Sequence, residues 1–227
     1  ARSLRLISPF PPGGAADVLA RNIAEELTPA LRQSVVVENR TGAGGSVGTE
    51  AVVRSAADGY TLLMGSTGPL AINPALLRLA YDPAKDLVPV AMVSTVASVL
   101  VVHPSMPVKY VGDLIALAKS KPDAIVFASS GNGTIIHLAM EAIRAQAGIK
   151  MVHAPYKGSA PAAASVLSGE TAASYTTTPA ALPYTKTGRL RAIGVSSAKR
   201  SPILPDVPAI GETLKGYDII LYSGLFA

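Results

Sequence analysis

The residues best suited to binding a small anion lie in one short segment, Ser129 to Thr134. It holds three hydroxyl side chains, the Asn132 amide and two glycines, between an apolar run typical of a strand and a predicted helix that begins near Thr134. At such a turn several N–H and O–H donors can converge on one carboxylate. We favour binding by Ser130, Asn132, Gly133 and Thr134 over simple capping of the helix.

A second candidate loop runs from Pro9 to Asp17. Its prolines stiffen the chain, and Gly13 and Gly14 expose backbone N–H groups where a helix begins, a geometry suited to an anion. Phe10 would supply an apolar wall. The alternative is a rigid strand-to-helix turn in which Asp17 merely complements the helix dipole, and the residues alone leave both interpretations open.

Three further segments follow predicted strands and carry polar side chains. Ser66 and Thr67 offer hydroxyl donors, although capping of the next helical turn is their commoner role. Lys157 can place a positive charge opposite an anion, although an exposed lysine is usually only solvated. The ring of Tyr156 can pack against the ligand. A run of threonines from 176 to 178 either faces a binding cleft or caps a helix.

The candidate loops lack the usual sequence signatures of catalysis and cofactor binding. The glycines of Gly42 to Gly48 resemble a dinucleotide loop, but their spacing does not match it, and no phosphate-binding G-x-x-x-x-G-K-[ST] motif occurs. Ser129 and Ser130 lack the flanking glycines of a G-x-S-x-G nucleophile motif. There is no Cys, and the three His lack metal-ligand spacing. We therefore expect no cofactor, no metal site and no enzymatic activity. The alternative is a hydrolase that uses Ser129 or Ser130 with His137 or His153 as the base.

The amino-acid composition further limits the class of protein that this chain can be. Of 227 residues, 49% are hydrophobic and 15% charged, and the chain contains 20 Gly and 18 Pro, which indicates buried elements joined by many short turns. The net charge of +5 is scattered, and with aromatic residues at 5% and no Trp the chain lacks the patches that nucleic acid binding needs. The longest uncharged apolar stretch, Leu87 to Val102, is shorter than the ~20 residues of a membrane span, so we predict a buried strand there.

Strand-like and helix-like segments alternate along the chain, which predicts an α/β fold with parallel sheets. Apolar side chains recur at helical spacing over residues 17–31, between strand-like runs at 4–7 and 35–38. The pattern restarts near residue 100, so we predict one lobe of residues 1–99, with 220–227 returning to it, and a second lobe of residues 100–219. The last apolar strand lacks a helix to cover it, and we expect that a further part of the fold is missing after Ala227.

Six ordered segments resemble the Bug family, the periplasmic receptors of tripartite tricarboxylate transporters. The similarity covers essentially the whole chain. The segments are PFPPGGAAD from Pro9, VVENRTGAGG from Val36, DGYTLLMG from Asp58, SSGNGT from Ser129, PYKGS from Pro155 and SSAKRS from Ser196.

The resemblance implies a two-lobed type II periplasmic-binding-protein fold of mostly parallel sheets flanked by helices, with a ligand carboxylate in the cleft between the lobes. It implies a periplasmic monomer that presents a small carboxylate to membrane transporter subunits, or alternatively to a sensor kinase ectodomain. The ligand residues that it indicates are Phe10, Gly13, Gly14, Ala15, Asp17, Ser66, Thr67, Ser130, Asn132, Gly133, Thr134, Tyr156, Lys157 and Thr176.

The sequence departs from the family pattern at Ala172 and Thr176, where relatives lead us to expect Asp. A ligand ammonium group would need a carboxylate partner at the position of Thr176. An acid that carries only carboxylates or hydroxyls therefore fits better than an amino acid.

Overall fold

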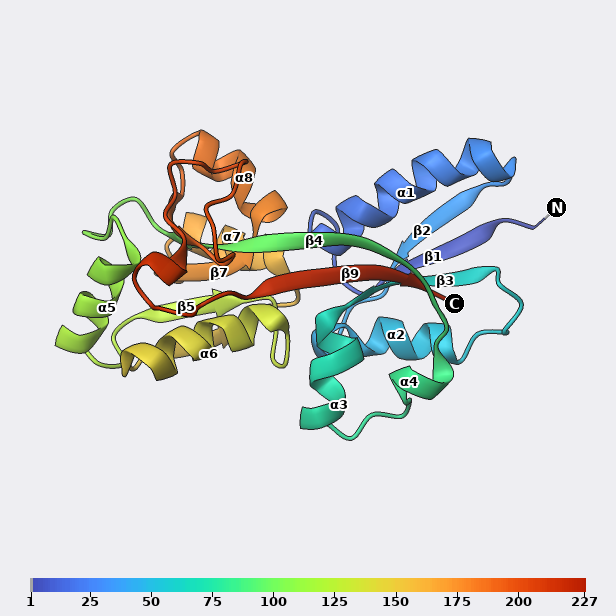
Figure 1. Cartoon of the computed structure of the whole chain (residues 1–227), viewed down its shortest axis with the longest axis horizontal. Helices are drawn as coiled ribbons and strands as arrows, with labels where there is room; N and C mark the ends of the chain where they lie inside the picture. Colours follow the sequence, from blue (N-terminus) through green and yellow to red (C-terminus); the bar gives the residue numbers. More distant parts are fainter. Residues whose placement is uncertain (1) are drawn as a thin grey trace. The chain divides into compact units, whose positions relative to one another are not determined.

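A computed structural model describes residues 2–227 of the chain (Figure 1). The chain divides into two compact units. Unit 1 comprises the chain up to Thr95, together with Gly133–Ile135 and Tyr222–Ala227, and unit 2 comprises Val96–Asn132 and Ile136–Leu221. The sequence placed the first division between residues 99 and 100, and that division stays a prediction.

Unit 1 begins with the predicted alternation of strands and helices. Its first elements are β1 (Leu4–Ser8), α1 (Ala15–Leu31), β2 (Val35–Asn39), α2 (Ser46–Val53) and β3 (Thr61–Ser66). β1 lies between β2 and β3 and pairs with both in parallel. The carboxyl ends of all three strands consequently lie at one edge of the sheet.

Shorter elements complete unit 1, and most of them carry no periodic signal in the sequence. They are the 3-10 turn η1 (Ala43–Gly45), the π-helical turn η2 (Gly68–Ile72), α3 (Asn73–Leu76) and α4 (Pro83–Asp86). The final strand, β9 (Ile220–Phe226), pairs antiparallel with β3, so a distant part of the chain extends the first sheet.

Unit 2 repeats the alternation with a second sheet. Its elements are β4 (Pro89–Val102, shared with unit 1), α5 (Val111–Ser120), β5 (Val126–Ser129), α6 (Ile135–Ala147), β6 (Val152–Pro155), α7 (Ser159–Leu167), β7 (Ala173–Thr177), α8 (Thr178–Lys186), β8 (Arg191–Val195) and the 3-10 turn η3 (Ile210–Glu212). β5 pairs in parallel with β6 and β7, whereas β4 is antiparallel to β7 and β8. The carboxyl ends of β5, β6 and β7 therefore share one edge.

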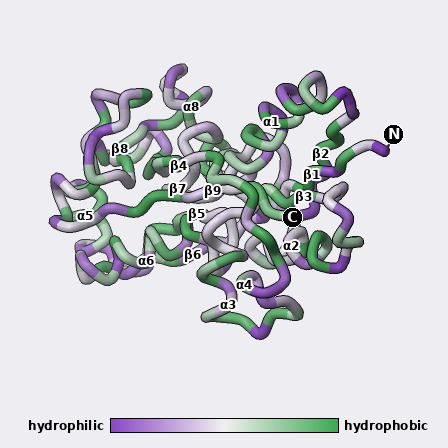
Figure 2. Tube along the Cα trace, turned by 45° about the vertical axis from the view of Figure 1, so that its right-hand side comes forward, coloured by the Kyte–Doolittle hydropathy of each residue, from purple (hydrophilic) through white to green (hydrophobic). Residues whose placement is uncertain are grey.

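Each unit has its own apolar core. In unit 1, α1 packs Ala16, Ala20 and Ala24 against Leu6 and Met64 of the sheet. In unit 2, a second cluster joins the buried half of β4 to α7, α8 and β8. Figure 2 shows β4 mainly in hydrophobic colours, whereas the outer loops next to α5 and α6 are hydrophilic.

The mixed α/β fold class predicted from the sequence is confirmed. The strand predicted over residues 87–102 is one continuous element, β4, and its last four residues have no exposed surface. The prediction that the whole strand is buried was wrong, because the first four residues of β4 are exposed. No helix among residues 2–227 is long and apolar enough to cross a membrane.

Candidate functional site

Three loops meet at the carboxyl edge of the unit 1 sheet. They follow β1, β2 and β3 and contain the predicted residues Phe10 to Asp17, the glycines of η1, and Ser66 with Thr67. The parallel pairing brings together residues that are more than 50 positions apart in the sequence. This edge is where open α/β sheets bind ligands.

Asp17 holds the first loop in shape. Its side chain is buried, and its Oδ2 accepts hydrogen bonds from the Gly13 N–H at 3.0 Å and from Arg21 Nε at 3.1 Å. Its Oδ1 accepts from Asn39 Nδ2 at 2.9 Å. Burial by itself would raise the pKa of Asp17, but the hydrogen bonds from Arg21, Asn39 and Gly13 outweigh burial and hold the pKa below its ordinary value. The Asp17 carboxylate thus stays charged, and it accepts its hydrogen bonds from Gly13, Arg21 and Asn39.

Gly13 has a φ of 84°, a left-handed conformation that favours glycine, and it is exposed. Gly14 is the N-cap residue of α1 and Ala15 is its first residue, and both are buried. This arrangement places the backbone N–H groups of the helix start at the sheet edge, as the sequence predicted for an anion-binding turn.

The half-buried ring of Phe10 packs against the glycine loop that follows β2. A Cβ atom on Gly45 would lie 3.1 Å from the ring, so only a residue without a side chain fits there unstrained. Asn39 Nδ2 also donates a hydrogen bond to the Phe10 carbonyl at 2.8 Å. The Phe10 loop is therefore fixed from two sides.

Ser66 and Thr67 do not cap the next helical turn. Ser66 is buried in β3, and the Thr67 hydroxyl accepts a hydrogen bond from the Tyr222 N–H at 3.2 Å. Both residues line a largely apolar cavity of about 340 Å³ together with residues of β4 and β9. Thr67 thus links β3 to the final strand.

A second loop cluster follows β5, β6 and β7 of unit 2, and the end of its first loop, from Gly133, is assigned to unit 1. Ser130 and Thr134 are buried in the first of these loops, and Asn132 is exposed. Gly131 and Gly133 have φ values of 124° and 72°, which explains why the loop needs glycine at both positions. The predicted donor loop therefore forms a tight turn into α6.

Ser129 and His153 meet beneath this loop. The Ser129 Oγ lies 2.7 Å from His153 Nε2 and accepts a hydrogen bond from the Gly131 N–H at 3.2 Å. The His153 ring stacks on Phe127, with the ring centres 4.9 Å apart, and on His137, with the centres 4.2 Å apart. The two histidines that the sequence placed on separate elements thus form one stack.

The remaining predicted residues of unit 2 differ in exposure. Tyr156 is half-buried and its N–H donates to the Ser129 carbonyl at 3.0 Å, whereas Lys157 is exposed. Thr176 has no exposed surface, and its hydroxyl donates to the Ser159 carbonyl at 3.1 Å. That hydroxyl is engaged at the start of α7, and a ligand contact of Thr176 stays a prediction.

Several polar residues outside the predicted set complete the two edges. Asn39 ties two loops together, and the buried Asn73 donates to Ser46 Oγ at 2.8 Å. Thr177 is buried, and among the described residues its hydroxyl has no hydrogen-bond partner. The sequence could have indicated Asn39, because it lies inside one of the segments that resemble the family. It could not have indicated Asn73 or Thr177, because only the fold shows that they are buried.

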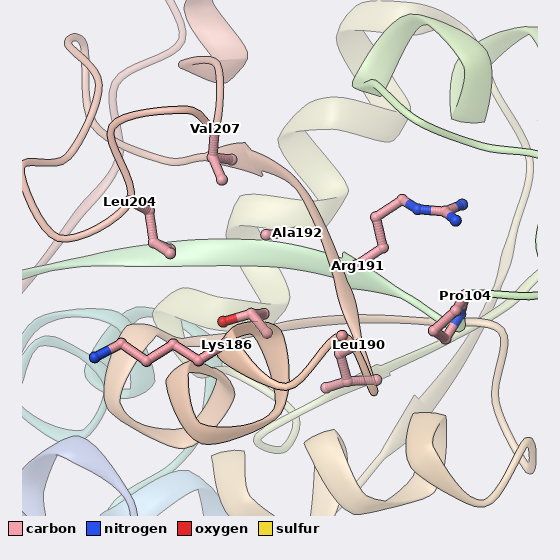
Figure 3. Close-up of a pocket in the computed structure, with 9 residues that line it drawn as sticks. Pro104, Lys186, Leu190, Arg191, Ala192, Leu204 and Val207 are labelled. Atoms are coloured by element: carbon pink, nitrogen blue, oxygen red, sulfur yellow. The ribbon is translucent and has the colours of Figure 1, made fainter.

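A second cavity, of about 430 Å³, contains none of the predicted site residues (Figure 3). It lies in unit 2 beside Pro104 and the start of β8, with Leu204 and Val207 at its apolar side. Arg191 belongs to its lining, but the guanidinium donates to the carbonyls of Met106 and Val108 at 3.1 and 3.0 Å. The Arg191 guanidinium is therefore engaged by backbone carbonyls of the protein itself.

No group of three or more potential metal ligands occurs among residues 2–227. The His137 and His153 pair faces Ser129, Phe127 and Glu141.

Residues 19–227 match the family described as the tripartite tricarboxylate transporter family receptor. The chain belongs to this family. The receptor is also 43% identical over 229 residues to Protein BugT of Bordetella pertussis, an alignment that covers 100% of this chain and 70% of BugT. The resemblance identified from the six sequence segments is thus confirmed.

Solved structures of similar proteins share the receptor's fold. A structure of R. palustris Rpa4515 with adipate has a TM-score of 0.96 at 35% identity, covering 100% of the receptor and 77% of that chain. A structure of MatC from Rhodopseudomonas palustris with bound malate has a TM-score of 0.94 at 29% identity, covering 100% of the receptor and 78% of that chain. Both neighbours were determined with a dicarboxylic acid.

Proposed function

We propose that this protein is a periplasmic receptor that captures a small organic acid and delivers it to a tripartite tricarboxylate-type membrane transporter. In this proposal loops at the carboxyl ends of the parallel strands bind the carboxylate, and the protein performs no catalysis. The observation that carries the proposal is the similarity along the whole chain to proteins solved with adipate and malate.

The donor chemistry of the loops supports a carboxylate ligand. The start of α1 offers N–H groups, and the loop after β5 offers hydroxyls and an amide. Such uncharged donors bind an anion without the cost of burying another charge beside it. Lys157 adds a cation at the exposed rim of that cluster.

The absence of an acid at Thr176 supports a ligand without an ammonium group. The hydroxyl there donates to the Ser159 carbonyl and brings no negative charge. A malate-like or adipate-like acid therefore fits the proposed site better than an amino acid does.

A calorimetric panel tests the proposal. Malate, adipate, citrate, acetate and glutamate would be titrated into the protein, with a thermal-shift series as a second measurement. We expect a dicarboxylate to bind and to raise Tm, and glutamate to bind at least about tenfold more weakly. Binding by glutamate alone would contradict the ligand class, and the absence of any stabilising anion would contradict the receptor proposal.

The Ser129 and His153 contact is the one observation that favours the hydrolase alternative. Three features oppose it: Ser129 has no exposed surface, the neighbours of the His153 ring are aromatic, and burial lowers the pKa of His153 to about 4, which is low for a general base at neutral pH. An ester-hydrolysis assay on wild type, Ser129→Ala and Ser130→Ala tests it. Turnover that either variant loses while ligand binding is kept would overturn the receptor proposal.

Delivery to a transporter requires a liganded form that membrane subunits recognise. Pull-down with and without malate, using transporter subunits and a sensor kinase ectodomain as separate baits, distinguishes the two partner classes. We expect ligand-dependent capture by the transporter subunits. Capture by the sensor alone would replace the transport role with a sensing role.

A further inference from the structure

The hydrogen bonds around Ser129 connect a buried histidine to the backbone of the Ser129–Thr134 loop. His153 lies on β6, Ser129 ends β5, and Gly131 is in the loop itself. The chain of contacts runs from His153 Nε2 to Ser129 Oγ at 2.7 Å and from the Gly131 N–H to the same Oγ at 3.2 Å. One serine oxygen is therefore shared between the ring and the loop.

This contact acts on a strained position of the loop. Gly131 has a φ of 124°, outside the range that other residues adopt readily, and its N–H is fixed by Ser129 Oγ. The orientation of Gly131 sets the direction in which the chain enters the donor residues 132–134. A change at Ser129 Oγ is thus transmitted to the loop backbone.

The protonation state of His153 decides which way the Ser129 hydroxyl points. With a neutral ring, Nε2 can accept the Ser129 proton while Oγ accepts the Gly131 N–H. A protonated ring has two N–H donors and no acceptor, so it must donate to Oγ, and the hydroxyl proton then turns toward the Gly131 carbonyl at 3.5 Å. That distance is at the limit of a hydrogen bond, so the second arrangement is weaker.

The surroundings of His153 keep the ring neutral. Phe127 and His137 stack on its two sides, and α6 adds Glu141 and Arg144 as the charged groups nearby. Burial is the largest cause of the lowered pKa of His153, followed by the charges of His137 and Arg144, while Glu141 opposes them. The first arrangement of the hydroxyl therefore prevails at neutral pH.

We propose that His153 is a positioning residue for ligand binding, which acts through Ser129 to hold the Ser129–Thr134 loop in its anion-binding shape. This inference rests on the proposed function, since it assumes that the loop binds the carboxylate. It assigns His153 a role in binding that acts through its contact with Ser129.

The first test needs no ligand. Amide hydrogen exchange at Gly131 would be measured in wild type, Ser129→Ala, His153→Phe and His153→Gln. We expect exchange to be about tenfold faster in S129A, which loses the acceptor of the Gly131 N–H. Exchange should also be faster in H153F, because the Ser129 hydroxyl loses its partner and is no longer held in place. Gln places its terminal amide near the position of Nε2, so H153Q should restore protection to within about threefold of wild type.

A matched control lies elsewhere in unit 2. His103 Nδ1 is also 2.7 Å from a serine hydroxyl, that of Ser105, in the turn after β4 and away from the loop. His103→Phe should leave Gly131 exchange unchanged. Equal exchange at Gly131 in wild type, S129A and H153F would overturn the proposal.

The second test measures malate and adipate affinity by calorimetry at pH 7 and pH 4. We expect H153F to raise Kd about tenfold and H153Q to raise it less than threefold at pH 7, with H103F unchanged. The ratio of the wild-type Kd to the H153Q Kd should rise at pH 4, because the His153 ring takes up a proton near this pH, whereas H153Q has no ring to protonate. A constant ratio, together with equal Kd values in H153F and wild type, would refute the positioning role.

The two tests separate this inference from the proposed function. If neither acid binds wild type, the proposed function fails, while the exchange measurement still tests the coupling of His153 to the loop. If the acids bind and Gly131 protection is independent of His153, only the present inference fails. If H153F does not fold, S129A and H153Q still provide the comparison.

Discussion

Asn39 and Asp17 join the end of β2 to the start of α1 through a hydrogen bond of 2.9 Å from Asn39 Nδ2 to Asp17 Oδ1. The same amide nitrogen donates to the carbonyl of Phe10 at 2.8 Å. One side chain thus fixes both ends of the first candidate loop, while Asp17 in turn holds the Gly13 N–H. The shape of the loop depends on residues that do not themselves need to contact a ligand.

Replacing Asn39 by Ala should weaken both folding and ligand binding. The variant leaves the buried Asp17 with one donor fewer and frees the Phe10 carbonyl, so we expect a loss of about 1–3 kcal/mol in unfolding free energy. Urea unfolding measures this loss, and calorimetry with malate measures binding. Asn22→Ala, on the exposed face of α1, is the control and should stay within about 0.5 kcal/mol. Equal stability of the two variants would argue against this role of Asn39.

Two glycine substitutions should have opposite effects. A Cβ on Gly48 would lie 2.6 Å from the Arg40 carbonyl and 2.8 Å from Pro9 Cα, both backbone atoms, so Gly48→Ala should destabilise by about 1–3 kcal/mol. A Cβ on Gly112, in α5, meets nothing within 4 Å, so Gly112→Ala should stabilise by up to about 1 kcal/mol. Thermal unfolding checks both, and a Tm change of the same sign would contradict the packing described here.

Neighbouring threonines at the end of β7 should differ in their contribution to stability. Thr176→Val removes the buried hydrogen bond to the Ser159 carbonyl, which costs about 0.5–1.5 kcal/mol. Thr177→Val removes a hydroxyl without a hydrogen-bond partner among the described residues and should be neutral or stabilising. Urea denaturation of the unliganded protein gives the comparison. A ligand contact at Thr176 would instead appear as a raised Kd with little change in stability.

Stability should fall as the pH is lowered from about 6.5 to about 4. His153 takes up a proton near pH 6.5 when unfolded but only near pH 4 when folded. In this interval the unfolded state binds more protons, so lowering the pH stabilises it relative to the folded state. Below about 4 both states are protonated at this position and the loss levels off. His153→Gln should show a smaller decrease in Tm over the same interval, with a remainder from His137, whose pKa burial also lowers.

Asp17 adds an acid-side effect at lower pH. Because its pKa is held below the ordinary value, its ionised form stabilises the folded state above an unfolded value of 3.8, and this contribution is lost as the pH falls further. Asp17→Asn should reduce stability at pH 7 and flatten the profile below pH 4. A variant whose profile matches wild type below pH 4 would contradict the charged state assigned to Asp17.

The sequence by itself determined the alternation of elements and the family. Periodic apolar residues such as Leu19, Ile23 and Leu27 define α1, because helix and strand periods are local properties of the chain. Gly13, Gly131 and Gly133 marked both candidate loops, since their backbone conformations with positive φ favour glycine.

The tertiary structure decided which polar groups are available and which are engaged within the protein. No local pattern reveals that the Thr176 hydroxyl meets Ser159, that Asp17 is held by Asn39, or that His153 stacks between Phe127 and His137. These contacts join residues up to 26 positions apart, as His153 and Phe127 show, and they exist only because parallel pairing aligns the carboxyl ends of separate strands. The hydrogen-bond partners of a polar side chain are a property of the whole fold, and that is why the sequence indicated the loops but only the structure assigned roles to their residues.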